Sequence, residues 1–433
     1  MSSIWTETVK LPTFQRLESD KKTAVLIIGG GIAGILCAYQ LSLAGVDYIL
    51  VEAKRICSGV TENTTAKLTS QHGLVFDRLI REFGVENARL YLQANNDALQ
   101  TYKELCRGID CDYEIKDNYV YTLNNEEKIE NELKALEKIG GCANYIKNLP
   151  LPFQTKGTVS FPNQAQFHPL KFLAEIAQKL NIYENSKVIE LGLCIAKTET
   201  ATIYADNIIV ATHYPMNNKH GAYYLKLYQS RSYVAALENA QSVDGMYVDE
   251  SDTGFSFRNY KGYLLLGGGG HRTGRDGGNW HVIEKFAREH YPEAEIKMRW
   301  AAQDCMSLDK VPYIGLYGKH TEGFYVTAGY NKWGMTSAMV SAKLLIDRIL
   351  SKENPYSQLF QPYNRSMIRK QLFINMAEST ANLLTPSLKR CPHMGCALKW
   401  NRDEHSWDCP CHGFRFTEDG QLIDNPATSD LKQ

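Results

Sequence analysis

Two cysteines and two histidines near the C-terminus have the spacing of a metal-binding site. They form the pattern C-x-H-x15-C-x-x-H, in which two short hooks each carry one thiol and one imidazole: Cys391 and His393, then Cys409 and His412. Two thiolates on one iron and two imidazoles on the other hold one type of [2Fe–2S] cluster. The same four groups also satisfy a tetrahedral structural zinc. The spacing therefore predicts a metal centre and leaves both metals open.

A glycine-rich turn near the N-terminus has the setting of a dinucleotide-binding site. Gly29, Gly31 and Gly34 follow the apolar strand 24–28 and open an apolar helix. These glycines permit a tight turn, close approach of the backbone to a pyrophosphate, and packing of helix on strand. The helix N-terminus offers free N–H groups to the phosphates. Glu52, at the tip of the next strand, can accept hydrogen bonds from ribose hydroxyls. The motif alone does not distinguish FAD from NAD.

The elements that must position these groups indicate a mixed α/β protein. Residues 78–140 have a mainly helical pattern, and residues 183–210 return to a strand pattern. Residues 223–300 are rich in tyrosine and β-branched residues, which favours an antiparallel sheet. A strand at 324–329, a helix at 335–350 and a polar connector complete the chain before the cysteine-rich tail.

Composition and charge exclude several classes of function. Lys+Arg and Asp+Glu balance at 48 each, which favours neither a nucleic acid nor an acidic membrane as partner. No apolar run approaches the roughly 20 residues of a membrane span, and the N-terminal residues lack the apolar core of a signal peptide. We therefore predict a cytoplasmic protein. In that compartment the cysteines outside the tail are expected to be thiols rather than a disulfide framework.

Several separate segments resemble the D-amino-acid-oxidase-like family of FAD-dependent oxidoreductases, over about residues 22–350. They are 209–212, His168-Pro169 with Val188 downstream, 300–315, 329–336 and, nearest to a branch with an appended Rieske domain, 59–67. The resemblance implies FAD and places it against Gly29, Gly31, Ile32, Ala33, Gly34, Glu52, Ala53, Thr61, Thr64, Thr65, Ala66, Val188, Ala211, Thr212, Gly329, Trp333, Gly334, Met335 and Thr336. No second dinucleotide site is expected, because the glycine run 267–270 lacks the required third glycine.

The C-terminal tail is similar to Rieske domains at 391–396, 400–401, 407–413 and 425–428, which favours a [2Fe–2S] cluster over zinc. That resemblance implies a possible disulfide between Cys396 and Cys411. Phe414 and Phe416 stand where high-potential Rieske proteins have hydroxyl-bearing residues, so we predict a low-potential centre. Much of the usual supporting sheet before the first ligand is missing. We expect the FAD body or a second subunit to cover the exposed edges.

Together these features predict an FAD-binding Rossmann-like domain interleaved with an antiparallel-sheet substrate domain, followed by a small, shortened Rieske β domain. The predicted ranges are 22–77, 150–215 and 305–350 for the FAD-binding domain, 78–149 and 216–304 for the substrate or cap domain, 351–385 for a connector, and 386–433 for the Rieske domain.

The resemblance places a small-molecule substrate against the flavin, under the antiparallel sheet. Candidate catalytic residues are the polar groups expected there: Lys67, His72, Arg258 and His271, with Arg272 beside them. We expect a dehydrogenase that oxidises an amine or amino-acid-like substrate at FAD and passes single electrons through the cluster. The alternatives are an oxidase that uses O₂ with a structural cluster, and a non-enzymatic redox sensor or electron-transfer protein. The acceptor or donor protein and the oligomeric state stay open.

Overall fold

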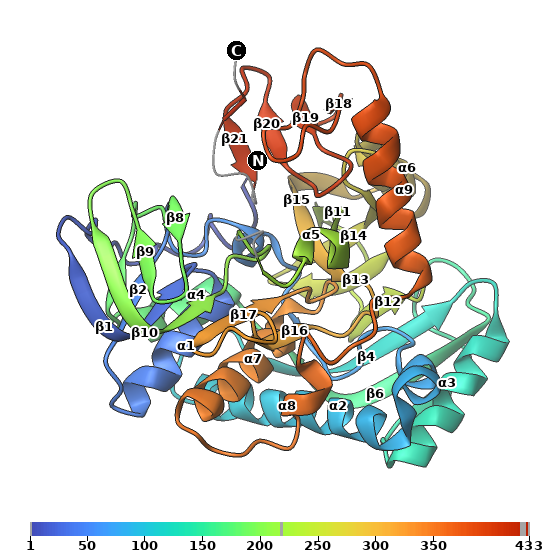
Figure 1. Ribbon diagram of the computed structural model, residues 1–433. Helices are drawn as coiled ribbons and strands as arrows, with labels where there is room; N and C mark the ends of the chain where they lie inside the picture. Colours follow the sequence, from blue (N-terminus) through green and yellow to red (C-terminus); the bar gives the residue numbers. More distant parts are fainter. Residues whose placement is uncertain (1, 217–219, 425–429, 432–433) are drawn as a thin grey trace.

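The computed structural model describes residues 2–216, 220–424 and 430–431, and it contains three β-sheets (Figure 1). The Rieske-like segment 425–428 lies outside the described residues. Two large sheets form the body of the molecule, and a small C-terminal sheet sits on top of it in Figure 1. Within the described part of the chain, no helix is both long and apolar enough to cross a membrane.

The glycine-rich turn belongs to an eight-stranded, mainly parallel sheet. Its main path runs β16-β17-β10-β1-β2-β7, with β9 paired to β10 and β8 paired to β9. The strands β2 and β17 are buried along their whole length, which is why both are uninterrupted apolar or small-residue runs. The bounds are β1 Lys21–Ile28, β2 Tyr48–Val51, β7 Ile182–Tyr183, β8 Glu190–Leu191, β9 Ile195–Lys197, β10 Thr202–Val210, β16 Tyr313–Leu316 and β17 Phe324–Ala328.

The second sheet has nine strands and is mainly antiparallel. Its order is β15-β11-β14-β13-β12-β4-β6-β3, with β5 paired to β6. The long strands β11, β14 and β15 pair side by side through most of their length. The bounds are β3 Lys67–Leu68, β4 Glu114–Thr122, β5 Asn144–Ile146, β6 Gly157–Gln166, β11 Leu227–Glu238, β12 Met246–Asp249, β13 Ser256–Tyr260, β14 Tyr263–Arg272 and β15 Glu295–Ser307.

Helices pack around these two sheets. The helix that follows the glycine-rich turn, α1, packs against α7, and α2 contacts both α3 and α7. A bend interrupts α2 at Gly84, whose φ of 83° is left-handed. The bounds are α1 Ile32–Leu43, the 3₁₀ turn η1 Val60–Asn63, α2 Phe76–Cys106, α3 Glu126–Ile139, α4 Pro169–Ala177, α5 Tyr223–Lys226, α6 Trp280–His290, α7 Gly334–Ile349, α8 Ser357–Phe360 and α9 Lys370–Leu384.

The third sheet has four short antiparallel strands in the order β18-β19-β20-β21. They are β18 Lys399–Asn401, β19 Ser406–Asp408, β20 Arg415–Thr417 and β21 Leu422–Asp424. The sheet has an apolar core of its own, built largely from four cysteines with Phe414 and Phe416. Figure 1 shows this sheet above β11, β14 and β15, with α9 beside it.

Strand β6 belongs to the nine-stranded sheet. We placed residues 150–215 with the FAD-binding part, but β6 pairs antiparallel with β4 from Gly157 to Gln166, in the nine-stranded sheet. Partner strands separated by a whole helix and loop cannot be identified from local periodicity, so this pairing depends on tertiary structure. We propose that the FAD-binding part resumes at α4.

Candidate active site and cluster site

A cavity of about 590 Å³ lies where the two large sheets meet. Its lining comes from the glycine-rich turn, the loop 57–65, the strand ends of the eight-stranded sheet, and strands β11, β14 and β15. The predicted cofactor residues that line it are Gly29, Gly31, Ile32, Ala33, Glu52, Ala53, Thr61, Thr64, Thr65, Val188, Ala211, Thr212, Trp333, Gly334 and Met335. Gly34, Ala66, Gly329 and Thr336 lie outside the lining. The structure therefore gathers most of the predicted contacts, from distant parts of the chain, around one cavity.

The glycine-rich turn has the geometry that a dinucleotide requires. Gly29 has a φ of 113°, and a Cβ there would lie 2.5 Å from the carbonyl oxygen of Ala211. A Cβ on Gly34 would lie 1.9 Å from the carbonyl oxygen of Gly29, so no larger residue fits. The N–H of Gly30 donates to Glu52 Oε2 over 2.7 Å, which fixes that carboxylate at the end of β2. The residues present thus fit an FAD cradle.

Lys67 lies in the cavity wall and is almost fully buried. Its Nζ donates to Thr65 Oγ1 over 3.1 Å and lies 3.5 Å from Ser256 Oγ. Burial lowers the pKa of Lys67 to about 7, and the nearby charge of Arg258 acts in the same direction. An amine with that pKa can hold or release a proton near neutral pH, as general acid–base chemistry requires.

His72 also lines the cavity, but its ring is held in place by its neighbours. Nδ1 lies 2.6 Å from the hydroxyl of Tyr91, and Nε2 lies 2.9 Å from Thr336 Oγ1. The ring stacks on Trp333 with 5.1 Å between centroids. Burial lowers the pKa of His72 to about 3, so the imidazole is neutral at physiological pH. This arrangement fits a residue that orients the Trp333 turn.

The two other candidate catalytic residues lie outside the cavity lining. Arg258 is buried beneath the wall, where it donates to the carbonyl oxygens of Thr65 and Ala66 over 2.7 and 2.8 Å. His271 lies 3.0 Å from the Tyr233 hydroxyl and 3.0 Å from the carbonyl oxygen of Arg272. Arg258 therefore supports the loop that carries Lys67, and neither side chain is presented to a substrate in the cavity.

Asp304 was not among our candidates, although it lines the cavity. It lies in β15 between Gln303 and Cys305, and burial raises its pKa to about 6. Lys332 and Arg231 supply the opposing positive charge. An aspartate inside a long strand is unusual, because aspartate is depleted there. The aspartate within this strand was therefore the feature of the sequence that could have identified Asp304 as a candidate.

The four predicted metal ligands meet in the small sheet. Each hook is a tight turn closed by its own backbone: Gly395 N donates to the Cys391 carbonyl over 2.9 Å, and Gly413 N donates to the Cys409 carbonyl over 2.8 Å. The Cys391 and Cys409 side chains are hydrogen-bonded to each other. The rings of His393 and His412 lie 4.9 Å apart between centroids. The two hooks thus contribute one thiol each to one pair and one imidazole each to another.

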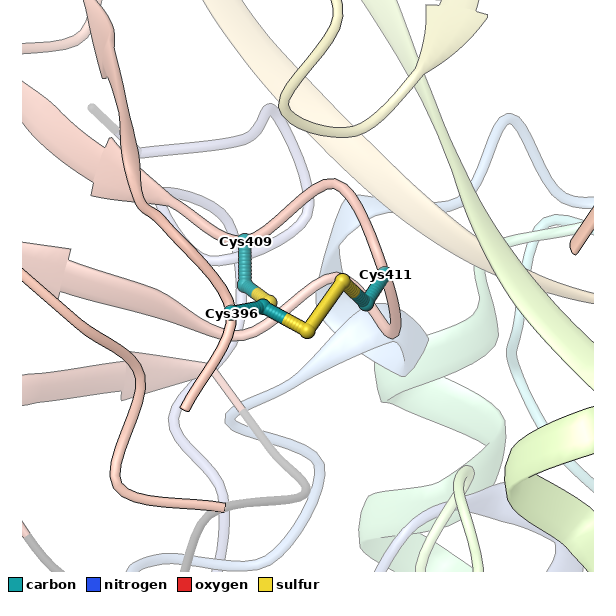
Figure 2. A group of neighbouring side chains, drawn as sticks. All are labelled: Cys396, Cys409 and Cys411. Carbon is teal, nitrogen blue, oxygen red and sulfur yellow. A yellow bond between two sulfur atoms is a disulfide. The ribbon is translucent and has the colours of Figure 1, made fainter. Parts of the chain in front are cut away.

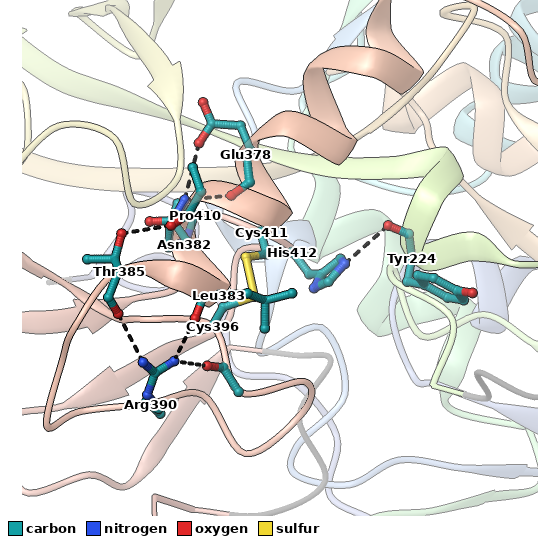
Figure 3. The surroundings of a disulfide bond; sticks show 12 residues. Tyr224, Glu378, Asn382, Leu383, Thr385, Arg390, Cys396, Pro410, Cys411 and His412 are labelled. Carbon is teal, nitrogen blue, oxygen red and sulfur yellow. Dashed lines mark hydrogen bonds between the residues drawn. A yellow bond between two sulfur atoms is a disulfide. The ribbon is translucent and has the colours of Figure 1, made fainter.

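The histidine ligands are suited to bind metal as neutral imidazoles. Burial lowers the pKa of His393 to about 4 and that of His412 to about 3. The Nδ1 atom of His412 is buried and has no hydrogen-bond partner among the described residues, while Nε2 faces the carbonyl oxygen of Tyr224 at 3.1 Å (Figure 3). A hydrogen bond at one ring nitrogen leaves the other to face a metal. The donor set therefore fits a cluster with Cys₂ and His₂ ligands.

Cys396 and Cys411 are joined in a disulfide that ties the two ligand loops together. Figure 2 shows the Cys409 sulfur beside this bridge, and the three sulfurs lie within 4.8 Å of one another. Bridged sulfurs offer no thiolate, so this group is not itself the ligand set. Arg390 braces the first loop by donating to the carbonyl oxygens of Leu383, Thr385 and Gly395 (Figure 3).

Sequence comparison agrees with these two sites. The FAD dependent oxidoreductase family matches residues 24–348, and the Rieske [2Fe-2S] domain matches residues 360–433. The chain belongs to the FAD-dependent oxidoreductase family. YhfW of Bacillus subtilis (strain 168), by its name a Rieske 2Fe-2S iron-sulfur protein, is 33% identical over 99% of this chain and 96% of its own length. It shares the architecture of an oxidoreductase body with a C-terminal Rieske domain.

More distant similarities cover about four fifths of the chain. Gamma-glutamylputrescine oxidoreductase of Escherichia coli (strain K12) is 24% identical, over 78% of this chain and 86% of its own length. The crystal structure of glycine oxidase from Geobacillus kaustophilus superposes with a TM-score of 0.66 at 18% identity, over 80% of this chain and 99% of that one. The predicted fold class is confirmed, as are FAD and a Rieske [2Fe–2S] cluster in place of zinc.

In this structure the oxidoreductase body covers the second cluster loop. Gln303 Nε2 donates to the Gly413 carbonyl over 2.8 Å, and Arg231 forms a buried, two-pronged ion pair with Glu404. A Cβ on Gly413 would lie 2.2 Å from Gln229 Cγ, so the loop is pressed onto β11. On the cofactor side, Ile423 of β21 lines the cavity. The body thus covers the second ligand loop, whereas Met394 of the first loop is 44% exposed.

Proposed function

We propose that this protein oxidises a small amine or amino-acid-like substrate at FAD and passes the electrons, one at a time, through the Rieske cluster to an external acceptor. Bound FAD would supply two-electron chemistry and the bound cluster one-electron chemistry, which is a natural pairing. The body's own residues would bind and orient the substrate and control its protons.

The observation that carries this proposal is the position of β11 and β15 between the cavity and the cluster loops. Side chains alternate in direction along a strand. In β15, Asp304 lines the cavity, whereas the adjacent Gln303 reaches the Gly413 carbonyl next to His412. Tyr214 lines the cavity too, and its ring centroid lies 6.3 Å from that of His412. The two sites are therefore separated by one layer of protein, which favours direct electron transfer.

The charged groups in the cavity support a substrate with an amino group. Asp304 contributes a carboxylate, and Lys67 an amine of lowered pKa, to the lining of the same cavity. A carboxylate in a cavity that is partly shielded from solvent would bind a substrate ammonium group by a charge-assisted hydrogen bond. Lys67 would accept the proton that the amine must lose before its oxidation.

Stopped-flow spectroscopy with a panel of amines tests this proposal. The panel consists of glycine, sarcosine, L-proline, putrescine and gamma-glutamylputrescine, mixed anaerobically with the holoprotein. We expect one of them to bleach the flavin absorbance first and to generate the EPR signal of reduced cluster second. The Cys409→Ser variant, which lacks a cluster ligand, should keep the first phase and lose the second. Flavin that O₂ reoxidises equally fast in both proteins would instead indicate an oxidase with a structural cluster.

A further inference from the structure

Arg272, the last residue of β14, joins the oxidoreductase body to the second cluster loop. Its Nε donates to the Pro410 carbonyl oxygen over 3.1 Å, and one terminal nitrogen donates to the Cys411 carbonyl over 3.1 Å. These two carbonyls lie between the ligands Cys409 and His412. The other terminal nitrogen donates to Asn375 Oδ1 over 2.8 Å. The guanidinium therefore binds the middle of the second cluster loop, which carries two of the four predicted cluster ligands.

The charge of Arg272 has no carboxylate bonded to it among the described residues. Arg272 is 9% exposed, and its three acceptors are neutral oxygens. Glu378, whose negative charge acts on Arg272, is bonded instead to Arg275. The Tyr228 ring also covers the guanidinium group, whose carbon lies 5.0 Å from the ring centroid. Arginine stays protonated in such a site, so the body places beside the second cluster loop a cation that is bonded to no carboxylate among the described residues.

A buried cation of this kind favours any neighbouring group that gains negative charge. With two ferric ions, two sulfides, two thiolates and two neutral imidazoles, a Rieske centre has no net charge. One electron, from reduced flavin or from dithionite in a titration, converts one ferric ion to ferrous and makes the net charge −1. The fixed cation beside the hook therefore favours the reduced state.

We propose that Arg272 is a positioning residue that holds the second ligand loop on the oxidoreductase body and raises the reduction potential of the cluster there. The part of this inference in which the cluster accepts electrons from flavin rests on the proposed function. In this arrangement the cluster has its working potential only while it is docked on the body. A cluster loop that left the body would lose the cation and become a poorer electron acceptor.

An EPR-monitored redox titration of the holoprotein with dithionite and mediators tests this inference without any substrate, so a wrong choice of substrate leaves the result interpretable. At the wild-type midpoint potential, Arg272→Met should lower the ratio of reduced to oxidised cluster at least tenfold, which is 59 mV for one electron. Arg272→Lys retains the charge and should change the ratio less than threefold. Arg288→Gln, which changes an exposed arginine of α6 on the same body, should leave it unchanged.

Two further variants distinguish the effect of the Arg272 charge on the potential from the effect of docking the loop on the body. They also keep the test valid if Arg272→Met fails to bind the cluster. Gln303→Leu removes the docking hydrogen bond to Gly413 without removing charge, and it should shift the ratio less than threefold. Asn375→Asp leaves Arg272 in place but pairs it with a carboxylate, and it should lower the ratio as Arg272→Met does. An unchanged ratio in both Arg272→Met and Asn375→Asp, or an equal shift in Gln303→Leu, would overturn the inference.

Discussion

Replacing the buried lysine of the cavity, by Lys67→Met, should make the protein more stable. Lys67 is 8% exposed, and burial lowers its pKa from 10.5 to about 7. At about 1.4 kcal/mol per pKa unit, burying this ammonium group costs up to about 5 kcal/mol near neutral pH. The hydrogen bonds to Thr65 and Ser256 return about 1 kcal/mol each. Methionine has a similar shape and no charge, so we expect a net gain of about 2–3 kcal/mol.

The gain should depend on pH with a definite sign. Below pH 7 the lysine is protonated in both the folded and the unfolded protein, and the full cost of burying its charge applies. Between pH 7 and about pH 10 the unfolded state binds more protons, so the stability of the wild-type protein rises with pH. Above that range both states are neutral and no cost is left. The advantage of Lys67→Met should therefore shrink as the pH rises from 7 toward 10.

Thermal denaturation of the apoprotein at pH 7 and at pH 9.5 measures this effect. The variant should melt several degrees higher at pH 7, and the two proteins should converge at pH 9.5. Lys310→Met, which changes an exposed lysine on the same cavity, should melt within about a degree of the wild type, as surface substitutions usually do. A lower melting temperature for Lys67→Met at pH 7, or a pH-independent difference, would refute the reasoning. Loss of turnover in the stabilised variant would indicate that Lys67 is kept for function.

Three other predictions concern the two cofactors and the substrate. Gly34→Ala should reduce the amount of bound FAD to less than a tenth of that in the wild type, because the added Cβ would lie 1.9 Å from the Gly29 carbonyl oxygen. Flavin absorbance per protein measures this, and a normal flavin content would contradict it. Asp304→Asn should lower kcat/KM for a cationic amine roughly tenfold to hundredfold, the range of a charged hydrogen bond. The wild-type kcat/KM should also fall as the pH drops below about 6, where Asp304 becomes protonated. If Asp304→Asn has the same pH profile as the wild type, Asp304 does not bind the amine. Phe416→Tyr should raise the midpoint potential of the cluster, since its hydroxyl would donate toward a cluster ligand. An EPR titration in which the variant has an unchanged or lower potential would contradict the argument that the missing hydroxyl at this position lowers the potential.

The sequence by itself determined the chemistry of both sites. The glycine-rich turn with Glu52, and the two cysteine–histidine hooks, are local patterns, because a tight turn or a chelating loop is built within about 20 residues. Their geometry follows from backbone rules that act at that range, such as the close approach of Gly34 to Gly29. These patterns predicted a dinucleotide site and a metal site, and the resemblance of further segments to known families then implied FAD and a [2Fe–2S] cluster.

Only the tertiary structure decided what surrounds those sites. Arg258, a candidate catalytic residue from its sequence, lies beneath the cavity wall and binds the carbonyl oxygens of Thr65 and Ala66, while Asp304 faces the cavity. Arg272 is separated by 138 residues from Pro410, whose carbonyl it binds. Contacts at such separations depend on how β11, β14 and β15 pair and on which face of the sheet each side chain takes. A shift of one residue in register would exchange those faces, which is why the local sequence could predict the cluster but not the surface that covers it.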